Sequence, residues 1–595
     1  MNNPKRDIDS KVSQFFLGFL RRTERGGGSW IEGSIFSFLA ILMSTYYASR
    51  RIAFYDFNFI QNTVYRMQIG QFPYRDFDLV LPAFTFFIVL LFAITVSSSI
   101  SFAIYLSTCL IIVISIFSVV GILNSLKDRF KFLGYRRFRL PFLTFCCVFN
   151  IVSVYPNYIY DSVVAAFSLV ALHFFMKFLK NSRNLDLMAC SVAIAATVFS
   201  KYNAGVPLMF GFLITIVLKI YVSEPKNVKE FIKFGGVLIA PTLALGLTCI
   251  YIFGNQFVYQ TLLAPGDYKG VFRLYQLAQY ENLVLEILFI FGLLGIVKPD
   301  FRRLFFRLVV LAVVIVLVGL TFSRLFLSPT LEMSVTGFFG GVDLLFPIMI
   351  LFAFFRVFYD FRKLEMIEAV VLISIPMLFL GSFLSQGWWG SSYALYPHLF
   401  IMLIFLHQSK ESTNSTIRAR LVIYTVTSLI AVQLIWNISS GIRLGYVENA
   451  GLRQGSPNWE KLGTAYSSRD VNSLKEVQSA ITSTGVKGTL LAFPPEDLLQ
   501  DFSDELTPWG RCLQFIDICP TTDSEQILRN FQSKAPTFLV LKLKPQINVR
   551  PVVPESIALL CFSKIFENDV YQVFTQNSAS QVCIKNEFTS KGLSS

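Results

Sequence analysis

Apolar runs alternate with short polar or Gly/Pro-containing breaks along most of this 595-residue chain. A helix needs about 20 apolar residues to cross a bilayer, within a usual range of roughly 17 to 25. The pattern therefore predicts about thirteen membrane-spanning helices. They lie near Ser34–Ala48, Ile100–Leu123, Leu140–Val154, Ser162–Leu179, Leu187–Phe199, Gly205–Tyr221, Phe234–Phe253, Leu283–Val297, Leu308–Phe322, Phe338–Phe355, Ala369–Leu384, Tyr393–Leu406 and Leu421–Trp436.

One further apolar stretch, Val80–Ser97, is left out of this count because of the charges that follow it. Counted as a span, it would place a short loop with six basic residues and a single acid outside the cell, against the positive-inside rule. The stretch is also somewhat short for a comfortable crossing. We therefore predict a helix that lies in the outer interface of the membrane. The basic residues of the following loop are Lys127, Arg129, Lys131, Arg136, Arg137 and Arg139.

With this arrangement, a single orientation of the chain places the basic loops on the cytoplasmic side. The chain then divides into three predicted parts. Residues 1–33 form a basic N-terminus that stays in the cytoplasm. Residues 34–438 form a transmembrane domain whose first outer loop covers 49–99. Residues 439–595 form a soluble domain on the extracytoplasmic side, because an odd number of spans separates it from the N-terminus.

The last part has the sequence pattern of an α/β domain. Helical periodicity covers Ser473–Thr484 and Glu525–Gln532, and short apolar runs predict strands at Gly488–Phe493, Thr537–Leu543 and Val570–Phe574. The domain contains no nucleophile elbow, phosphate loop or dinucleotide-binding glycine pattern. We interpret it as a structural cap or as a lid that docks an acceptor.

Composition supports a polytopic membrane protein and excludes an ordinary soluble one. The mean hydropathy is +0.56, and charged residues make up 15% of the chain, whereas about a quarter is usual in soluble domains. The net charge of +14 does not indicate nucleic-acid binding, because the basic residues gather in short loops between apolar runs. Four cysteines of the last domain allow three disulfide pairings, which the sequence leaves open. They are Cys512, Cys519, Cys561 and Cys583.

The first outer loop holds the candidate chemistry. Between two strongly apolar segments it carries Asp56, Arg75, Asp76 and Asp78, and each such group would cost roughly 2.5 to 3.5 kcal/mol at the centre of a bilayer. Asp56 is the best candidate for a general base, because it follows the first span where a lipid-borne group would reach the surface. The alternative is that Asp56 merely caps a helix beginning near Asn58.

Other charged residues lie in the outer loops between later spans, namely Asp161, Lys201, Arg273 and Arg324. Carboxylates and cations on one face of a membrane suit transfer from an anionic, lipid-anchored donor, since cations stabilise a departing phosphate. With three histidines in the chain, an all-histidine metal site is not expected. A divalent metal ion held by carboxylates stays open, and no other cofactor is predicted.

The order of a first span, an acidic residue, Gly70-Gln71-Phe72-Pro73-Tyr74-Arg75-Asp76-Phe77 and a proline-led apolar helix resembles the membrane glycosyltransferases of the GT-C fold. It is most similar to the aminoarabinose transferase and protein O-mannosyltransferase group. The resemblance implies paired juxtamembrane helices in the first outer loop. It also implies a polyprenyl-phosphate sugar donor and inversion at the anomeric carbon.

Matched to the family pattern, Asp56 corresponds to the base, and Asp76 or Asp78 to the acid before a Pro-Pro-Leu motif. Asp161 resembles a second acidic position and Lys201 a cation on the phosphate side, a role for which Arg273 and Arg324 are further candidates. The chain departs from the family at two places. Asp56-Phe57 replaces a paired Asp-Glu, and Leu81-Pro82-Ala83 replaces Pro-Pro-Leu.

We therefore predict an inverting glycosyltransferase that moves a sugar from polyprenyl phosphate to an extracytoplasmic glycan, lipid or protein. Its predicted location is the bacterial inner membrane, and nucleic acid is not an expected partner. The alternative is a transporter or flippase of a lipid-linked glycan. Transporters usually place ionisable groups near the midplane and often contain internal repeats, whereas here the charges gather at one face. A non-catalytic scaffold would not explain the first outer loop.

Overall fold

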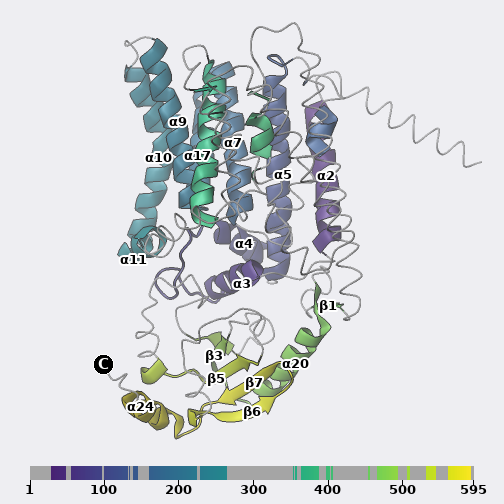
Figure 1. The fold of residues 1–595 in the computed structure, drawn as a ribbon, viewed down its shortest axis with the longest axis vertical. Coiled ribbons are helices and arrows are strands. Elements are labelled where there is room, and N and C mark those ends of the chain that lie inside the picture. The colour runs from purple at the N-terminus through teal and green to yellow at the C-terminus, as the bar shows by residue number, and fades with distance from the viewer. Residues whose placement is uncertain are drawn as a thin grey trace, which may run out of the picture.

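The computed structural model describes the chain in segments that cover the helical part and the C-terminal sheet (Figure 1). The described residues are 28–48, 55–96, 100–130, 133, 139–144, 160–223, 228–263, 353, 356–357, 364–386, 395, 397–402, 404–405, 453–455, 465–493, 506–509, 531–543 and 560–590.

Long apolar helices that run roughly parallel to one another form the main body of the protein (Figure 1). Neighbouring pairs in this bundle are α2 with α5, α5 with α7, α7 with α8, α8 with α10, and α9 with α17. Within the described residues, three helical segments are long and apolar enough to cross a membrane, namely Phe102–Leu126, Tyr160–Asn181 and Ile232–Phe253. The bundle helices are α2 (Gly28–Ala48), α5 (Ile100–Leu126), α7 (Tyr160–Asn181), α8 (Asn184–Val198), α9 (Tyr202–Ser223), α10 (Val228–Phe253) and α17 (Met366–Gln386).

Each of these seven helices coincides with a predicted span, within a few residues at each end. α5, for example, contains no charged residue along its 27 positions, so hydropathy alone locates it. Of the predicted spans at residues 140–154, 338–355 and 393–406, the structure describes some residues only, and those residues are helical. The predicted spans at 283–297, 308–322 and 421–436 lie outside the described residues, so the total of thirteen stays a prediction.

Two shorter helices lie at one end of the bundle, which we call the α3 end (Figure 1). They are α3 (Tyr55–Gln68) and α4 (Phe84–Thr95). α4 has 12 residues and rises only about 18 Å, against a hydrocarbon thickness of about 30 Å. The structure thus has a short apolar helix where the sequence predicted an interfacial one. At this end α10 also continues into α11 (Asn255–Val258) and the π-helical turn η4 (Tyr259–Leu263).

Ion pairs hold the opposite end of the bundle together. Arg129, just beyond α5, contacts Glu365 and Glu368 at 2.7 Å each. Glu368, in the first turn of α17, also pairs with Arg356 at 3.0 Å. The predicted cytoplasmic loops supply these basic residues, so the bundle separates them from the α3 end.

Close backbone contact joins α9 to α17. A Cβ atom added at Gly381 would lie 1.9 Å from the carbonyl oxygen of Asn203, and one at Gly211 would lie 2.6 Å from Cα of Ser374. Glycine at both positions lets the two helices approach this closely, as is common between membrane helices.

The C-terminal part forms a five-stranded mixed sheet with the strand order β4-β3-β5-β7-β6. β4, β3 and β5 are parallel, whereas β7 and β6 are antiparallel to their neighbours. Figure 1 shows the sheet beyond the α3 end of the bundle. The elements are β1 (Arg453–Gly455), β2 (Ala465–Ser467), α20 (Ser468–Ser483), β3 (Gly488–Phe493), β4 (Leu506–Pro508), β5 (Phe538–Lys542), β6 (Ser563–Glu567), β7 (Tyr571–Thr575) and α24 (Ser580–Ser590).

The predicted strands correspond to β3, β5 and β7, whose apolar side chains form the centre of the sheet. The sequence missed β6, because this edge strand is mostly exposed and carries Lys564 and Glu567. Charged edge strands of this kind discourage pairing with other chains, and they lack the apolar alternation by which strands are recognised.

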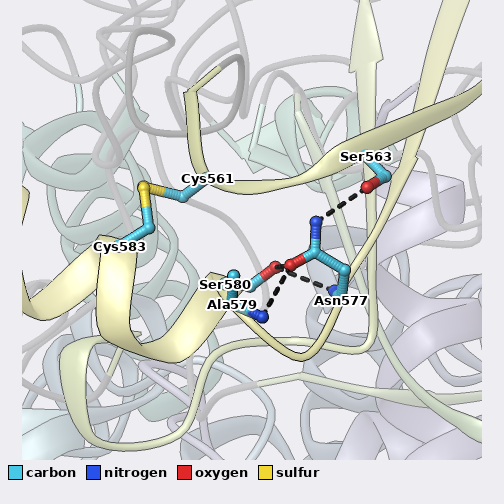
Figure 2. Close-up of a disulfide and its surroundings, with 6 residues drawn as sticks. All are labelled: Cys561, Ser563, Asn577, Ala579, Ser580 and Cys583. Atoms are coloured by element: carbon cyan, nitrogen blue, oxygen red, sulfur yellow. Dashed lines mark hydrogen bonds between the residues drawn. A yellow bond between two sulfur atoms is a disulfide. The ribbon is translucent and has the colours of Figure 1, made fainter.

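A disulfide fastens the edge of the sheet to the last described helix (Figure 2). Cys561, two residues before β6, bonds to Cys583 in α24, with their Cα atoms 5.4 Å apart. Asn577 reinforces the join, because its side chain donates to Ser563 Oγ at 2.8 Å and accepts from the N–H of Ala579 at 2.9 Å. The structure thus selects one cysteine pair that the sequence left open.

Candidate functional site

A buried ion pair joins α7 to the turn before α9. Nζ of Lys201 lies 2.6 Å from Oδ1 of Asp161, and the two side chains are 1% and 4% exposed. Asp161 occupies the first turn of α7, and Lys201 directly precedes α9. Two residues 40 positions apart, both predicted as site residues, are therefore in direct contact.

The surroundings of the pair leave one carboxylate oxygen available. Oδ2 of Asp161 is buried and has no hydrogen-bond partner among the described residues. The Lys201 ammonium also lies over the Tyr160 ring, 4.9 Å from its centre. A buried acceptor without a partner costs about 1 to 3 kcal/mol, so a ligand hydroxyl or amine that donates to Oδ2 would be favoured here.

Aromatic contacts connect this pair to the first outer loop. Tyr202, next to Lys201, packs edge-on against Phe257 of α11 at a ring distance of 6.3 Å. Phe257 in turn packs edge-on against Tyr74 of the loop at 5.1 Å. The buried pair and the loop are thus parts of one packed region at the α3 end.

The loop between α3 and α4 has an unusual backbone at Tyr74. This residue has φ of +65°, in the left-handed region that non-glycine residues seldom adopt, at a cost of roughly 1 to 3 kcal/mol. Its side chain is fully buried, and its hydroxyl donates to the carbonyl of Leu81 at 2.8 Å. Burial raises the pKa of Tyr74 well above its usual value, so the phenol keeps the proton for this bond.

Arg75 and Asp76 form a local turn on the exposed side of the loop. Asp76 accepts from the N–H of Phe72 at 2.7 Å and from Arg75 at 3.0 Å. The hydrogen bond to Asp76 raises the pKa of Arg75. Arg75 also lies over the Phe72 ring, 4.5 Å from its centre. Both charged groups thus stabilise the turn while remaining accessible from outside the protein.

Asp78 differs from Asp76, because it is 2% exposed and faces a neighbouring segment. Its Oδ1 accepts a hydrogen bond from Nε2 of Gln260 in η4, at 3.1 Å. Gln260 also bonds to the backbone of the loop at two further points. Of the two acids that could match the family position, Asp78 is the one held inside the protein.

Asp56 lies at the second position of α3, one residue after the helix begins at Tyr55. The alternative of a cap for a helix beginning near Asn58 is therefore wrong, because the helix starts three residues earlier. A carboxylate in the first turn still interacts favourably with the helix dipole. The side chain of Asp56 lies outside the described residues, as do Arg273 and Arg324.

Two functional candidates were missed from the sequence. Arg66 of α3 is 2% exposed, donates to Asn62 at 3.3 Å and lies over the Phe77 ring. Gln260 follows an apolar helix and belongs to no recognisable motif. No group of three or more His, Cys, Asp or Glu side chains that could hold a metal ion occurs in the described parts of the chain.

No protein-family model matches the chain, and neither does any curated protein. Among solved structures, the chain is similar to ArnT from Cupriavidus metallidurans bound to undecaprenyl phosphate. The identity is 12%, the TM-score is 0.43, and the match covers 93% of this chain and 99% of that one. It is also similar to an oligosaccharyltransferase from Archaeoglobus fulgidus in complex with zinc and sulfate. Here the identity is 10%, the TM-score is 0.40, and the match covers 85% of this chain and 68% of that one.

Both solved structures are GT-C glycosyltransferases, and ArnT is an aminoarabinose transferase. Both therefore have the GT-C fold that the sequence resembles. Because both TM-scores lie below 0.5, the likeness carries no argument about function.

Proposed function

We propose that the chain is an inverting glycosyltransferase that moves a sugar from a polyprenyl-phosphate donor to an acceptor outside the cytoplasm. The acceptor is a glycan, a lipid or a protein that docks between the first outer loop and the C-terminal domain. In this proposal the α3 end faces away from the cytoplasm, in the inner membrane of a bacterium.

The observation that carries the proposal is the gathering of Asp78, Asp161 and Lys201 at the α3 end of an apolar bundle. Charged groups are costly to bury, so a buried set of this kind is a functional-site candidate by default. The helix that carries Asp56 lies at the same end (Figure 1).

In the proposed reaction Asp56 accepts the proton of the acceptor hydroxyl or amine as general base. The freed lone pair attacks the anomeric carbon of the sugar from the face opposite the phosphate. The bond from that carbon to the phosphate oxygen breaks, and polyprenyl phosphate leaves with the bonding electrons. The product therefore has the inverted anomeric configuration, and no covalent enzyme intermediate forms.

The remaining candidates have binding roles. Oδ2 of Asp161 accepts a hydrogen bond from a sugar hydroxyl or amino group, while Lys201 holds that carboxylate in place and adds positive charge. Arg75, Arg273 and Arg324 are candidate cations for the phosphate. Cations near the departing phosphate lower the barrier, because they stabilise charge that develops in the transition state.

The test measures transfer of labelled sugar from a panel of polyprenyl-phosphate donors in membranes that contain the full chain. Asp56→Asn should abolish transfer while the protein stays folded and inserted, since the amide cannot accept the proton. Asp128→Asn is the matched control. Asp128 pairs with Lys180 at the opposite end of the bundle, so transfer should remain at the wild-type level.

Two results would contradict the proposal. Undiminished transfer by Asp56→Asn would exclude Asp56 as the base. Binding of the donors without turnover, together with movement of the lipid-linked sugar across sealed vesicles, would instead favour a transporter or flippase.

A further inference from the structure

Gln260 is a buried polar residue at the α3 end of the bundle. It lies in η4, directly after α11, and its side chain is fully buried. π-helical turns are rare, and they frequently occur at functional sites because they redirect side chains from the regular helical path. Here the turn directs an amide into the protein rather than into the membrane.

Among the described residues, the amide of Gln260 forms three hydrogen bonds, and all of them go to the loop between α3 and α4. Oε1 of Gln260 accepts from the N–H of Leu79 at 3.0 Å. Nε2 donates to the carbonyl of Tyr74 at 3.1 Å and to Oδ1 of Asp78 at 3.1 Å. Both donor hydrogens and the acceptor are thus used, across 181 to 186 positions of sequence.

The three partners of Gln260 are loop residues that depend on hydrogen bonds to keep their conformation or to satisfy a buried polar group. Tyr74 has the left-handed backbone, so a bond to its carbonyl holds a conformation that the chain would otherwise leave. Asp78 is a buried acid that requires hydrogen-bond donors. Leu79 leads into the segment before α4, and its N–H would otherwise be a buried donor.

We infer that Gln260 is a positioning residue for the proposed transfer reaction, which it serves by fixing Tyr74, Asp78 and Leu79 in one arrangement. This inference rests on the proposed function. It adds that a residue far from the first outer loop in the sequence determines the geometry of the acidic side of the site. An amide is the only neutral side chain that offers two donors and an acceptor in this plane.

Two substitutions separate positioning from general packing. Gln260→Leu removes all three bonds at similar volume, and it should lower the turnover number about tenfold or more, as expected for loss of buried hydrogen bonds. Gln260→Glu keeps the acceptor for Leu79 but places a second carboxylate about 3.1 Å from Asp78. Two carboxylates that close must share a proton.

The pH dependence is therefore the deciding readout. As pH falls from about 8 to about 5.5, the introduced carboxyl takes up a proton and can donate to Asp78, because the neighbouring charge raises its pKa. The transfer rate of Gln260→Glu relative to wild type should rise over this range. The relative rate of Gln260→Leu should stay flat. Thr248→Val is the control, since the Thr248 hydroxyl donates to the carbonyl of Ala244 within its own helix, α10, and the relative rate of this variant should stay near one.

Hydrogen exchange at Leu79 in the solubilised full chain provides a second readout that needs no activity. Exchange should be faster in Gln260→Leu than in wild type or Thr248→Val. Unchanged exchange at Leu79 would contradict the hydrogen bonds between η4 and the loop. Faster exchange with unchanged transfer, or a pH-independent ratio for Gln260→Glu, would overturn the positioning role. If wild type transfers no sugar from any donor, the proposed function fails, while the exchange result still decides whether the hydrogen bonds between η4 and the loop exist.

Discussion

Removal of one partner of the Asp161–Lys201 pair should reveal how strongly the site depends on it. Lys201→Met would leave a carboxylate that is 4% exposed without its cation. Loss of one member of a buried pair costs about 3 to 5 kcal/mol, because the remaining charge stays desolvated. An exposed pair would lose about 1 kcal/mol or less. The two cases therefore differ by more than the error of an unfolding measurement.

The assay is reversible unfolding in mixed micelles, applied to Lys201→Met, Asp161→Leu and the double variant, alongside sugar transfer. Each single variant should lose about 3 to 5 kcal/mol, and the double variant should recover much of it, because an apolar pair of similar volume is tolerated. Transfer should stay low in the double variant. A loss below about 1 kcal/mol in the single variants would refute the buried pair, and recovery of transfer in the double variant would refute its role in the site.

Three further predictions concern other parts of the chain. Gly381→Ala should destabilise the bundle by about 1 to 3 kcal/mol, because the added methyl group overpacks α17 against α9; thermal unfolding in detergent measures this. Cys561→Ser with Cys583→Ser should cost about 3 kcal/mol of stability, from the entropy of a loop spanning 22 positions; proteolysis of the sheet region measures it. The hydrogen bond from Lys180 lowers the pKa of Asp128 in the folded protein below its ordinary value of 3.8. The pair should therefore make a small stabilising contribution above about pH 3.8, which is lost as the pH falls through the folded-state pKa of Asp128. Asp128→Asn should abolish this part of the pH dependence of the free energy of unfolding.

Hydropathy located the helices of the bundle because burial in lipid requires long apolar runs, which the sequence displays directly. α5 is the clearest case, since its 27 residues include no charge. The basic loop that follows the span at Ile100–Leu123 led us to exclude Val80–Ser97 from the predicted spans. In the structure this stretch contains α4, a short helix at one end of the bundle. The orientation of the bundle follows from the same rule and stays a prediction.

The sequence allowed individual candidate residues of the site to be named, but it did not indicate their contacts. Asp161 and Lys201 stood out as charges at the ends of apolar runs, yet nothing in their spacing indicated that they pair. Gln260 was missed because periodicity reports which residues are apolar, whereas the contacts of Gln260 depend on a π-helical turn. The backbone of Tyr74 was equally hidden, since a tyrosine gives no sign of a positive φ.

The glycine contacts between α9 and α17 also affect how the chain assembles. Gly211 of α9 packs against Ser374 of α17. The ribosome adds Ser374 about 160 residues after Gly211. At roughly 5 to 20 residues per second, α9 stays in the membrane for about 8 to 32 seconds before this partner exists. During that time its glycine face is open to lipid or to a chaperone of membrane insertion. A substitution there would therefore harm the yield of newly made protein as well as the stability of the finished one.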